Sequence, residues 1–313
     1  MTAPSSAGTR PQVVLDTDIG TDVDDALALS VLLGSPEIDL VAVTTVYGDT
    51  LLRARMVTRL LALAGRRGVA VRAGLRETPA GRDIYWAGHE GSTMPGLEQE
   101  VVVDADDPAA AIRLLVDTVR GNPGRVSVLA VGPLTNIGAA ITLDPVFAAD
   151  VAEIVIMGGH FGALDRPPPS VEHNIKCDPE SAAIVFASGA AIRVVGLDVT
   201  ERTRIRAPEL ARIAAAGALG EELGNEVRQY WTVGATDGNT PHDPLVALAI
   251  SRPDLFTFVD ADVSVLMDAP VPGATPVHTP VRGGTRVATD VRAQDAVEQI
   301  VARIERAGRG TGA

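Results

Sequence analysis

Cysteine, lysine and aromatic residues are all scarce in this chain of 313 residues. The single cysteine, Cys177, excludes an intrachain disulfide and fits a reducing cytoplasm. Aromatic residues make up 3% of the chain and hydrophobic residues 46%, so we expect an aliphatic core. No apolar run approaches the length of a membrane span, and residues 1–10 lack the apolar stretch of a signal peptide. We therefore expect a cytoplasmic protein that does not enter a membrane.

Basic residues are also fewer than acidic ones. Lys176 is the only lysine, and 27 basic residues stand against 40 acidic ones, which gives a formal net charge of −13. An acidic surface repels phosphate backbones and anionic lipids. The composition therefore argues against nucleic acid and against a membrane as partners.

Short β-rich runs alternate with helical runs, which is typical of a mostly parallel open sheet flanked by helices, an α/β fold. We expect strands at Gln12–Asp16, Leu40–Val46, Val69–Arg72, Val126–Val131, Glu153–Met157, Arg193–Leu197, Phe256–Asp260 and Val263–Met267. We expect helices at Val23–Leu33, Leu51–Ala64, Pro108–Arg120, Leu134–Leu143, Glu180–Ala187, Pro208–Ala216, Glu221–Val233, Pro244–Ile250 and Ala293–Arg306. No Gly/Ser-rich linker divides the chain, so we expect one domain over residues 11–307, between a disordered tail (1–10) and a flexible one (308–313).

Aspartates cluster where the first expected strand ends, and the cluster comprises Asp16, Asp18, Asp22, Asp24 and Asp25. Helix capping accounts for one or two of them, but not for Asp16 and Asp18 at the end of an apolar strand. Clustered carboxylates repel one another unless a cation compensates them, and carboxylate oxygens favour Mg²⁺ or Ca²⁺ over zinc. An alternative is a phosphatase that uses a strand-end Asp-x-Asp nucleophile, because Asp16-Thr17-Asp18 matches that short pattern.

Further motifs follow in order along the chain between Val13 and Leu248. They are Val131-Gly132-Pro133-Leu134-Thr135-Asn136, Met157-Gly158-Gly159, Glu172-His173-Asn174, Asp198-Val199-Thr200 and His242-Asp243-Pro244. Together with the aspartate-rich loop, this series resembles the calcium-dependent nucleoside hydrolases of the inosine-uridine preferring type. The resemblance implies an enzyme that hydrolyses the N-glycosidic bond of a ribonucleoside to free base and ribose.

The resemblance also implies roles for individual residues. Asp18, Asp25, Asp243 and the backbone carbonyl of Val131 match the ligands of a Ca²⁺ ion. Asp18 matches the base that activates a calcium-bound water, and His242 matches the acid that protonates the leaving base. An imidazole suits that task near neutral pH.

The substrate-binding positions implied by the resemblance are Asp24, Asp49, Asn174 and Glu172. His89 is a further candidate because it lies in the glycine-rich loop Gly88-His89-Glu90-Gly91, and structural packing is an equal alternative for it. Asp24 and Asn174 match partners of the ribose hydroxyls, and Glu172 matches a residue near the ribose 5′ end. Asp49 and Arg166 stand where many members have asparagine, and Arg166 falls at the 5′-hydroxyl. Asp22 lies in a loop that is longer than the shortest family version, so the resemblance gives it no role.

Two other functions compete with nucleoside hydrolysis. The phosphatase needs a lysine near its phosphate, and it gives no reason for the pair His242-Asp243. A sugar- or nucleoside-binding protein that has lost turnover would not need to keep Asp18 and His242. The preference between purine and pyrimidine bases is not indicated by the sequence, and relatives of this kind are often homo-oligomers, dimers or tetramers.

Overall fold

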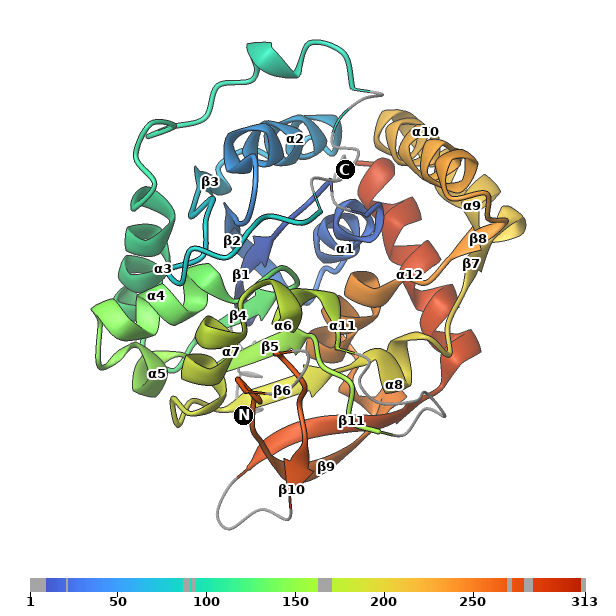
Figure 1. Ribbon diagram of the computed structural model, residues 1–313. Helices are drawn as coiled ribbons and strands as arrows, with labels where there is room; N and C mark the ends of the chain where they lie inside the picture. Colours follow the sequence, from blue (N-terminus) through green and yellow to red (C-terminus); the bar gives the residue numbers. More distant parts are fainter. Residues whose placement is uncertain are drawn as a thin grey trace, which may run out of the picture.

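The computed structural model describes residues 10–20, 22–86, 91, 94–162, 171–268, 272–278 and 284–310. Within these ranges a nine-stranded sheet has the order β10-β9-β11-β6-β5-β4-β1-β2-β3 (Figure 1). Its strands are β1 (Gln12–Thr17), β2 (Asp39–Thr45), β3 (Ala70–Ala73), β4 (Val126–Ala130), β5 (Glu153–Met157), β6 (Ile192–Val195), β9 (Phe256–Val263), β10 (Val277–His278) and β11 (Thr285–Val291). A separate antiparallel pair joins β7 (Ile205–Arg206) and β8 (Gly238–Asn239).

Helices cover both faces of the sheet (Figure 1). They are α1 (Asp24–Leu33), α2 (Thr50–Leu63), α3 (Ala110–Gly121), α4 (Thr135–Leu143), α5 (Phe147–Asp150), α6 (His173–Cys177), α7 (Pro179–Phe186), α8 (Leu197–Thr200), α9 (Ala207–Ala214), α10 (Gly217–Val233), α11 (His242–Ser251) and α12 (Ala293–Gly308). The helices α1, α2, α10, α11 and α12 pack on one face, and α3, α4 and α7 on the other. Within the described residues, no helix is long and apolar enough to span a bilayer.

Successive side chains along a strand point to opposite faces of the sheet, so each strand contributes to the apolar core on both faces. Val13 and Leu15 of β1 pack with α1, whereas Val14 between them packs with the helices of the opposite face. Every residue of β4 is buried, as expected for a central strand with helices on both faces. The strands from β3 across to β11 run parallel, so their carboxyl ends share one edge of the sheet. In an open sheet of this kind, that edge is where ligands bind.

The predicted α/β fold is confirmed. The short helices α5, α6 and α8 and the pair β7–β8 were not predicted, and within the nine-stranded sheet the errors lie among the C-terminal strands. The strand predicted at Val263–Met267 is wrong, because β9 runs without interruption from Phe256 to Val263. The strand β11 was missed, because Arg286 and Asp290 interrupt its apolar pattern. Helix α10 begins at Gly217 rather than at Glu221.

Tertiary packing explains the early start of α10. A Cβ atom at Gly220 would lie 2.2 Å from the carbonyl oxygen of Ile213 in α9. Glycine is unfavourable inside a helix, but here it allows two helices to approach closely. The N-terminal tail expected at residues 1–10 falls almost wholly on residues 1–9, which lie outside the described part of the chain. Of the C-terminal tail expected at 308–313, residues 311–313 lie outside the described part, and Gly308 is the last residue of α12.

Candidate active site

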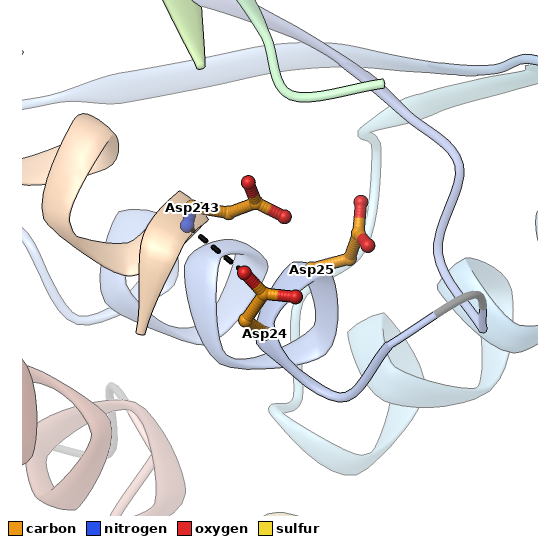
Figure 2. Close-up of side chains that lie close together, drawn as sticks. All are labelled: Asp24, Asp25 and Asp243. Carbon is orange, nitrogen blue, oxygen red and sulfur yellow. Dashed lines mark hydrogen bonds between the residues drawn. The ribbon is translucent and has the colours of Figure 1, made fainter. Parts of the chain in front are cut away.

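Two helices present their N-termini to the same point beyond the carboxyl ends of the strands. Helix α1 begins at Asp24 and α11 begins at His242, and the two helices pack against each other. Asp24, Asp25 and Asp243 each offer an oxygen atom within 4.8 Å of the other two (Figure 2). The backbone amide of Asp243 donates to Oδ2 of Asp24 at 3.2 Å. The positive ends of both helix dipoles therefore favour negative charge at this position.

A cavity of about 300 Å³ lies over this cluster. Carboxylates dominate its walls, and they belong to Asp18, Asp22, Asp24, Asp25, Glu172 and Asp243. Asn174, His173, His242, Tyr230 and Trp86 complete its polar and aromatic lining. Among the described residues that line the cavity, none is lysine or arginine. The described lining of the cavity is thus strongly anionic.

The electrostatics of the aspartate cluster fit a hard divalent cation. Burial raises the pKa of Asp24 well above its usual range, and repulsion from Asp22 and Asp25 raises it further. Burial raises the pKa of Asp243 in the same way, with repulsion from Asp24 and Asp25 added to it. Buried carboxylates of this kind are stable in the ionised state only when a cation compensates them. Oxygen donors alone are the ligands that Ca²⁺ and Mg²⁺ prefer.

Asp16 lies beneath the cavity and supports the loop that carries the other aspartates. Its Oδ1 accepts hydrogen bonds from the hydroxyl of Thr44 and, at 2.7 Å, from the amide of Asn136. Burial raises the pKa of Asp16 to about 7, and these two hydrogen bonds act in the opposite direction. The side chain therefore holds β1, β2 and the start of α4 in register at the base of the site.

Arg53 holds the same loop from the other side and was not anticipated from the sequence. Its buried guanidinium donates to the carbonyl oxygens of Asp18 and Ile19, and to that of Tyr47 at 2.7 Å. Its charge also lowers the pKa of Asp25, against the larger effect of burial. Helical spacing is the signal that could have revealed it, because Arg53 shares the buried face of α2 with Thr50 and Val57.

Asn174 and Glu172 occupy the wall formed by α6. The amide nitrogen of Asn174 donates to the carbonyl oxygen of Val131 at 2.8 Å and to that of Met157 at 3.3 Å. Glu172 caps the helix, and its carboxylate accepts from the backbone amides of Gly159, Asn174 and Ile175. Within the described part of the chain, the side-chain oxygen of Asn174 is left to accept a hydrogen bond, whereas both oxygens of Glu172 already have partners.

Asp22 faces the cavity from the loop that the resemblance left without a role. The hydroxyl of Tyr230, in the last turn of α10, donates to Oδ2 of Asp22 at 2.8 Å. Burial is the main reason that the pKa of Asp22 is raised, and the hydrogen bond from Tyr230 lowers it in part. The pair therefore ties α10 to the aspartate-rich loop across the cavity.

Not every predicted site residue joins this assembly. Asp49 is exposed, caps α2 by accepting from the amide of Leu52 at 3.1 Å, and is absent from the described lining. Positive φ angles at Tyr47 (66°) and Gly48 (72°) turn the chain just before Asp49. The geometry therefore gives no support to a ribose contact at Asp49. His89 and Arg166 lie outside the described residues.

The position of Asp18 depends on close packing against Gly132. If Asp18 is the base that the resemblance implies, we expect Gly132→Ala to lower kcat by about 10²-fold. A Cβ atom at residue 132 would lie 2.9 Å from both the amide nitrogen and Oδ1 of Asp18. A shift of about 1 Å in a catalytic group can cost roughly 10²-fold in rate. Gly121→Ala is the control in steady-state assays, because a Cβ atom there meets nothing within 4 Å. Equal rates for the two variants would show that Asp18 tolerates displacement.

Comparison with known proteins agrees with this geometry. Residues 13–299 match the family model described as inosine-uridine preferring nucleoside hydrolase. A probable uridine nucleosidase 2 of Arabidopsis thaliana is 34% identical over 268 residues, which cover 81% of each chain. A pyrimidine-specific ribonucleoside hydrolase, RihA, of Citrobacter koseri is 34% identical over 265 residues, covering 81% of this chain and 83% of that protein.

Solved structures give the same result. A plant nucleoside hydrolase superposes with a TM-score of 0.83 at 30% identity, covering 95% of this chain and 99% of the other. A purine-preferring ribonucleoside hydrolase from Gardnerella vaginalis superposes with a TM-score of 0.81 at 27% identity and the same coverage. The chain belongs to the nucleoside hydrolase family. It is an N-ribohydrolase, an enzyme that hydrolyses the N-glycosidic bond of ribonucleosides.

Proposed function

We propose that this enzyme cleaves uridine and related ribonucleosides with Ca²⁺ bound at the aspartate cluster, Asp18 as the base and His242 as the acid. The observation that carries the proposal is the convergence of these groups on one cavity: buried carboxylates from the loop after β1 and from α1, and His242-Asp243 at the start of α11. Uridine is proposed because curated relatives that are 34% identical are named as uridine or pyrimidine nucleosidases.

Asp18, Asp25, Asp243 and the carbonyl oxygen of Val131 would hold the ion, and Asp24 lies close enough to take part. A bound divalent cation would compensate the buried carboxylates and increase the acidity of a nearby water. Asp18 accepts a proton from that water as its oxygen forms a bond to the anomeric carbon of ribose. The electron pair of the breaking C–N bond stays with the base, which receives a proton from His242. The surrounding carboxylates stabilise the positive charge that develops on the sugar.

The test is release of free ribose from uridine, cytidine, inosine and adenosine after exhaustive chelation, with Ca²⁺ or Mg²⁺ then added back. We expect no activity in the chelated protein and stronger recovery with Ca²⁺. Full activity after chelation would contradict the metal assignment. If activity recovered with Mg²⁺ but not with Ca²⁺, the metal of the site would be magnesium and not calcium.

His242→Ala is expected to lower kcat on a nucleoside by about 10²-fold or more, the usual contribution of a general acid. A riboside with p-nitrophenol as leaving group should lose much less, because that anion departs without a proton. Steady-state kinetics on both substrates measure the difference. Equal losses would show that His242 contributes to binding or structure instead.

A phosphatase is disfavoured by the place of Lys176. Its ammonium lies over the ring of Tyr85, 4.4 Å from the ring centroid, and it is not among the described residues that line the cavity. A p-nitrophenyl phosphate assay beside the nucleoside panel separates the two reactions. A non-catalytic binding protein would retain uridine without releasing ribose. We further propose a cytoplasmic homo-oligomer, a dimer or tetramer, whose mass light scattering would measure.

A further inference from the structure

Thr200 contacts the proposed acid, although it does not itself belong to the described cavity lining. It is the last residue of α8, is fully buried, and places its Oγ1 2.8 Å from Nδ1 of His242. Helix α8 packs against α11, which begins with His242. The hydroxyl of Thr200 therefore contacts the ring of His242 at Nδ1.

The hydrogen bonds around Thr200 show which group its hydroxyl binds. Within the described part of the chain, Nδ1 of His242 is its hydrogen-bond partner. The nearby Thr203 hydroxyl donates to the carbonyl oxygen of Thr200 at 2.8 Å and leaves Oγ1 of Thr200 for the imidazole. A buried polar group without a partner costs about 1–3 kcal/mol. Loss of the Thr200–His242 hydrogen bond would therefore leave the buried hydroxyl of Thr200 and Nδ1 of His242 without this partner, which is unfavourable.

We propose that Thr200 is a positioning residue that fixes the imidazole of His242 so that Nε2 delivers the proton to the leaving base. This inference rests on the proposed acid role of His242. Because Thr200 holds Nδ1, Nε2 is the ring nitrogen that transfers the proton. Nδ1–H donates to Oγ1 of Thr200 both before and after Nε2 gives up its proton, so the contact persists through the transfer. A methyl group in place of the hydroxyl could accept this hydrogen bond in neither state.

The step balances without any further reactant. Water adds its oxygen to the anomeric carbon and gives one proton to Asp18. The base keeps the electron pair of the C–N bond and takes the proton from Nε2 of His242. Thr200 exchanges no atom with the substrate, and its effect is confined to the orientation of the ring.

The test compares Thr200→Val, Thr200→Ser and Thr203→Val on two substrates, p-nitrophenyl riboside and the better of uridine and inosine. We expect Thr200→Val to lower kcat on the nucleoside by about 10- to 100-fold, the usual effect of removing a group that orients a catalytic ligand. Its KM and its rate on p-nitrophenyl riboside should change little. Thr200→Ser should restore the nucleoside rate, because it restores the hydroxyl.

Thr203→Val is the matched control, since it removes a buried threonine hydroxyl from the same turn without touching His242. It should leave the ratio of the two substrate rates unchanged. In the His242→Ala background, Thr200→Val should have no additional effect on the nucleoside. Equal losses on both substrates, an additive double variant, or no rescue by serine would overturn the role of Thr200. An inactive wild-type enzyme would instead contradict the proposed function, so the two failures are distinguishable.

Discussion

Asp25→Asn and Asp243→Asn are each expected to abolish turnover, with kcat falling by about 10⁴-fold. A metal ion supplies several kcal/mol of charge stabilisation in reactions of this type, and each 1.36 kcal/mol corresponds to a tenfold change in rate. Both side chains are buried, and they lie in the cluster where three oxygens fall within 4.8 Å of one another. Asparagine keeps the shape of the side chain but removes the negative charge. Calcium titration followed by calorimetry should show a parallel loss of metal binding.

The same substitutions should have the opposite effect on the stability of the metal-free protein. Burial raises the folded-state pKa of Asp25 and of Asp243 well above the ordinary value for an aspartate side chain. A carboxyl group with a raised folded pKa contributes most to stability below about pH 3.8, and that contribution is lost as pH rises through the folded pKa. In the chelated wild type, the melting temperature should therefore fall as pH rises from 4 towards 8.

Thermal unfolding in the presence of a chelator measures this pH dependence. Asp25→Asn should melt at a higher temperature than the wild type at neutral pH and show a weaker dependence on pH. Asp39→Asn is the control, because Asp39 is exposed at the opposite end of the sheet, where β2 begins. If Asp25→Asn were both inactive and strongly destabilised without metal, the aspartate would serve the fold rather than a cation.

The site could be predicted from the sequence wherever its residues were close along the chain. Asp16, Asp18 and Asp25 stand at the end of an apolar strand and the start of an apolar helix, a pattern that few structural roles explain. The parallel sheet then brings Val131 beside them, since β4 pairs with β1. The backbone amide of Val131 donates to the carbonyl oxygen of Asp16 at 2.9 Å. Strand order thus turns a local motif into a three-dimensional site.

Contacts between distant residues were not predictable in the same way. Thr200 meets His242 across 42 positions, and Tyr230 meets Asp22 across 208. These contacts depend on how α8 and α10 pack, which local sequence patterns do not specify. Asp49 follows a strand as the other site residues do, but two residues with positive φ turn the chain before it and leave its side chain exposed. Its predicted contact with ribose stays a prediction.

The other large effect concerns the sugar, since 2′-deoxyuridine is expected to be a very poor substrate. Asp24 and Asn174 line the cavity with acceptor oxygens, and the amide nitrogen of Asn174 is held by the carbonyl of Val131 at 2.8 Å. These oxygens need donors, and the ribose hydroxyls would supply them. A site built to bind a hydroxyl discriminates against an analogue that lacks it by roughly 10⁴-fold, because the polar groups of the site are left unpaired.

The measurement is kcat/KM for uridine, 2′-deoxyuridine and 5′-deoxyuridine under identical conditions. The 5′-deoxy compound is the matched control, because Glu172, the residue expected at the 5′ end, already accepts from backbone amides at 2.7, 3.0 and 3.2 Å. It should therefore lose much less activity than the 2′-deoxy compound. Asn174→Ala should reduce the discrimination between uridine and 2′-deoxyuridine, since it removes one of the two acceptors. Comparable kcat/KM values for these two substrates would mean that Asp24 and Asn174 do not bind the ribose hydroxyls.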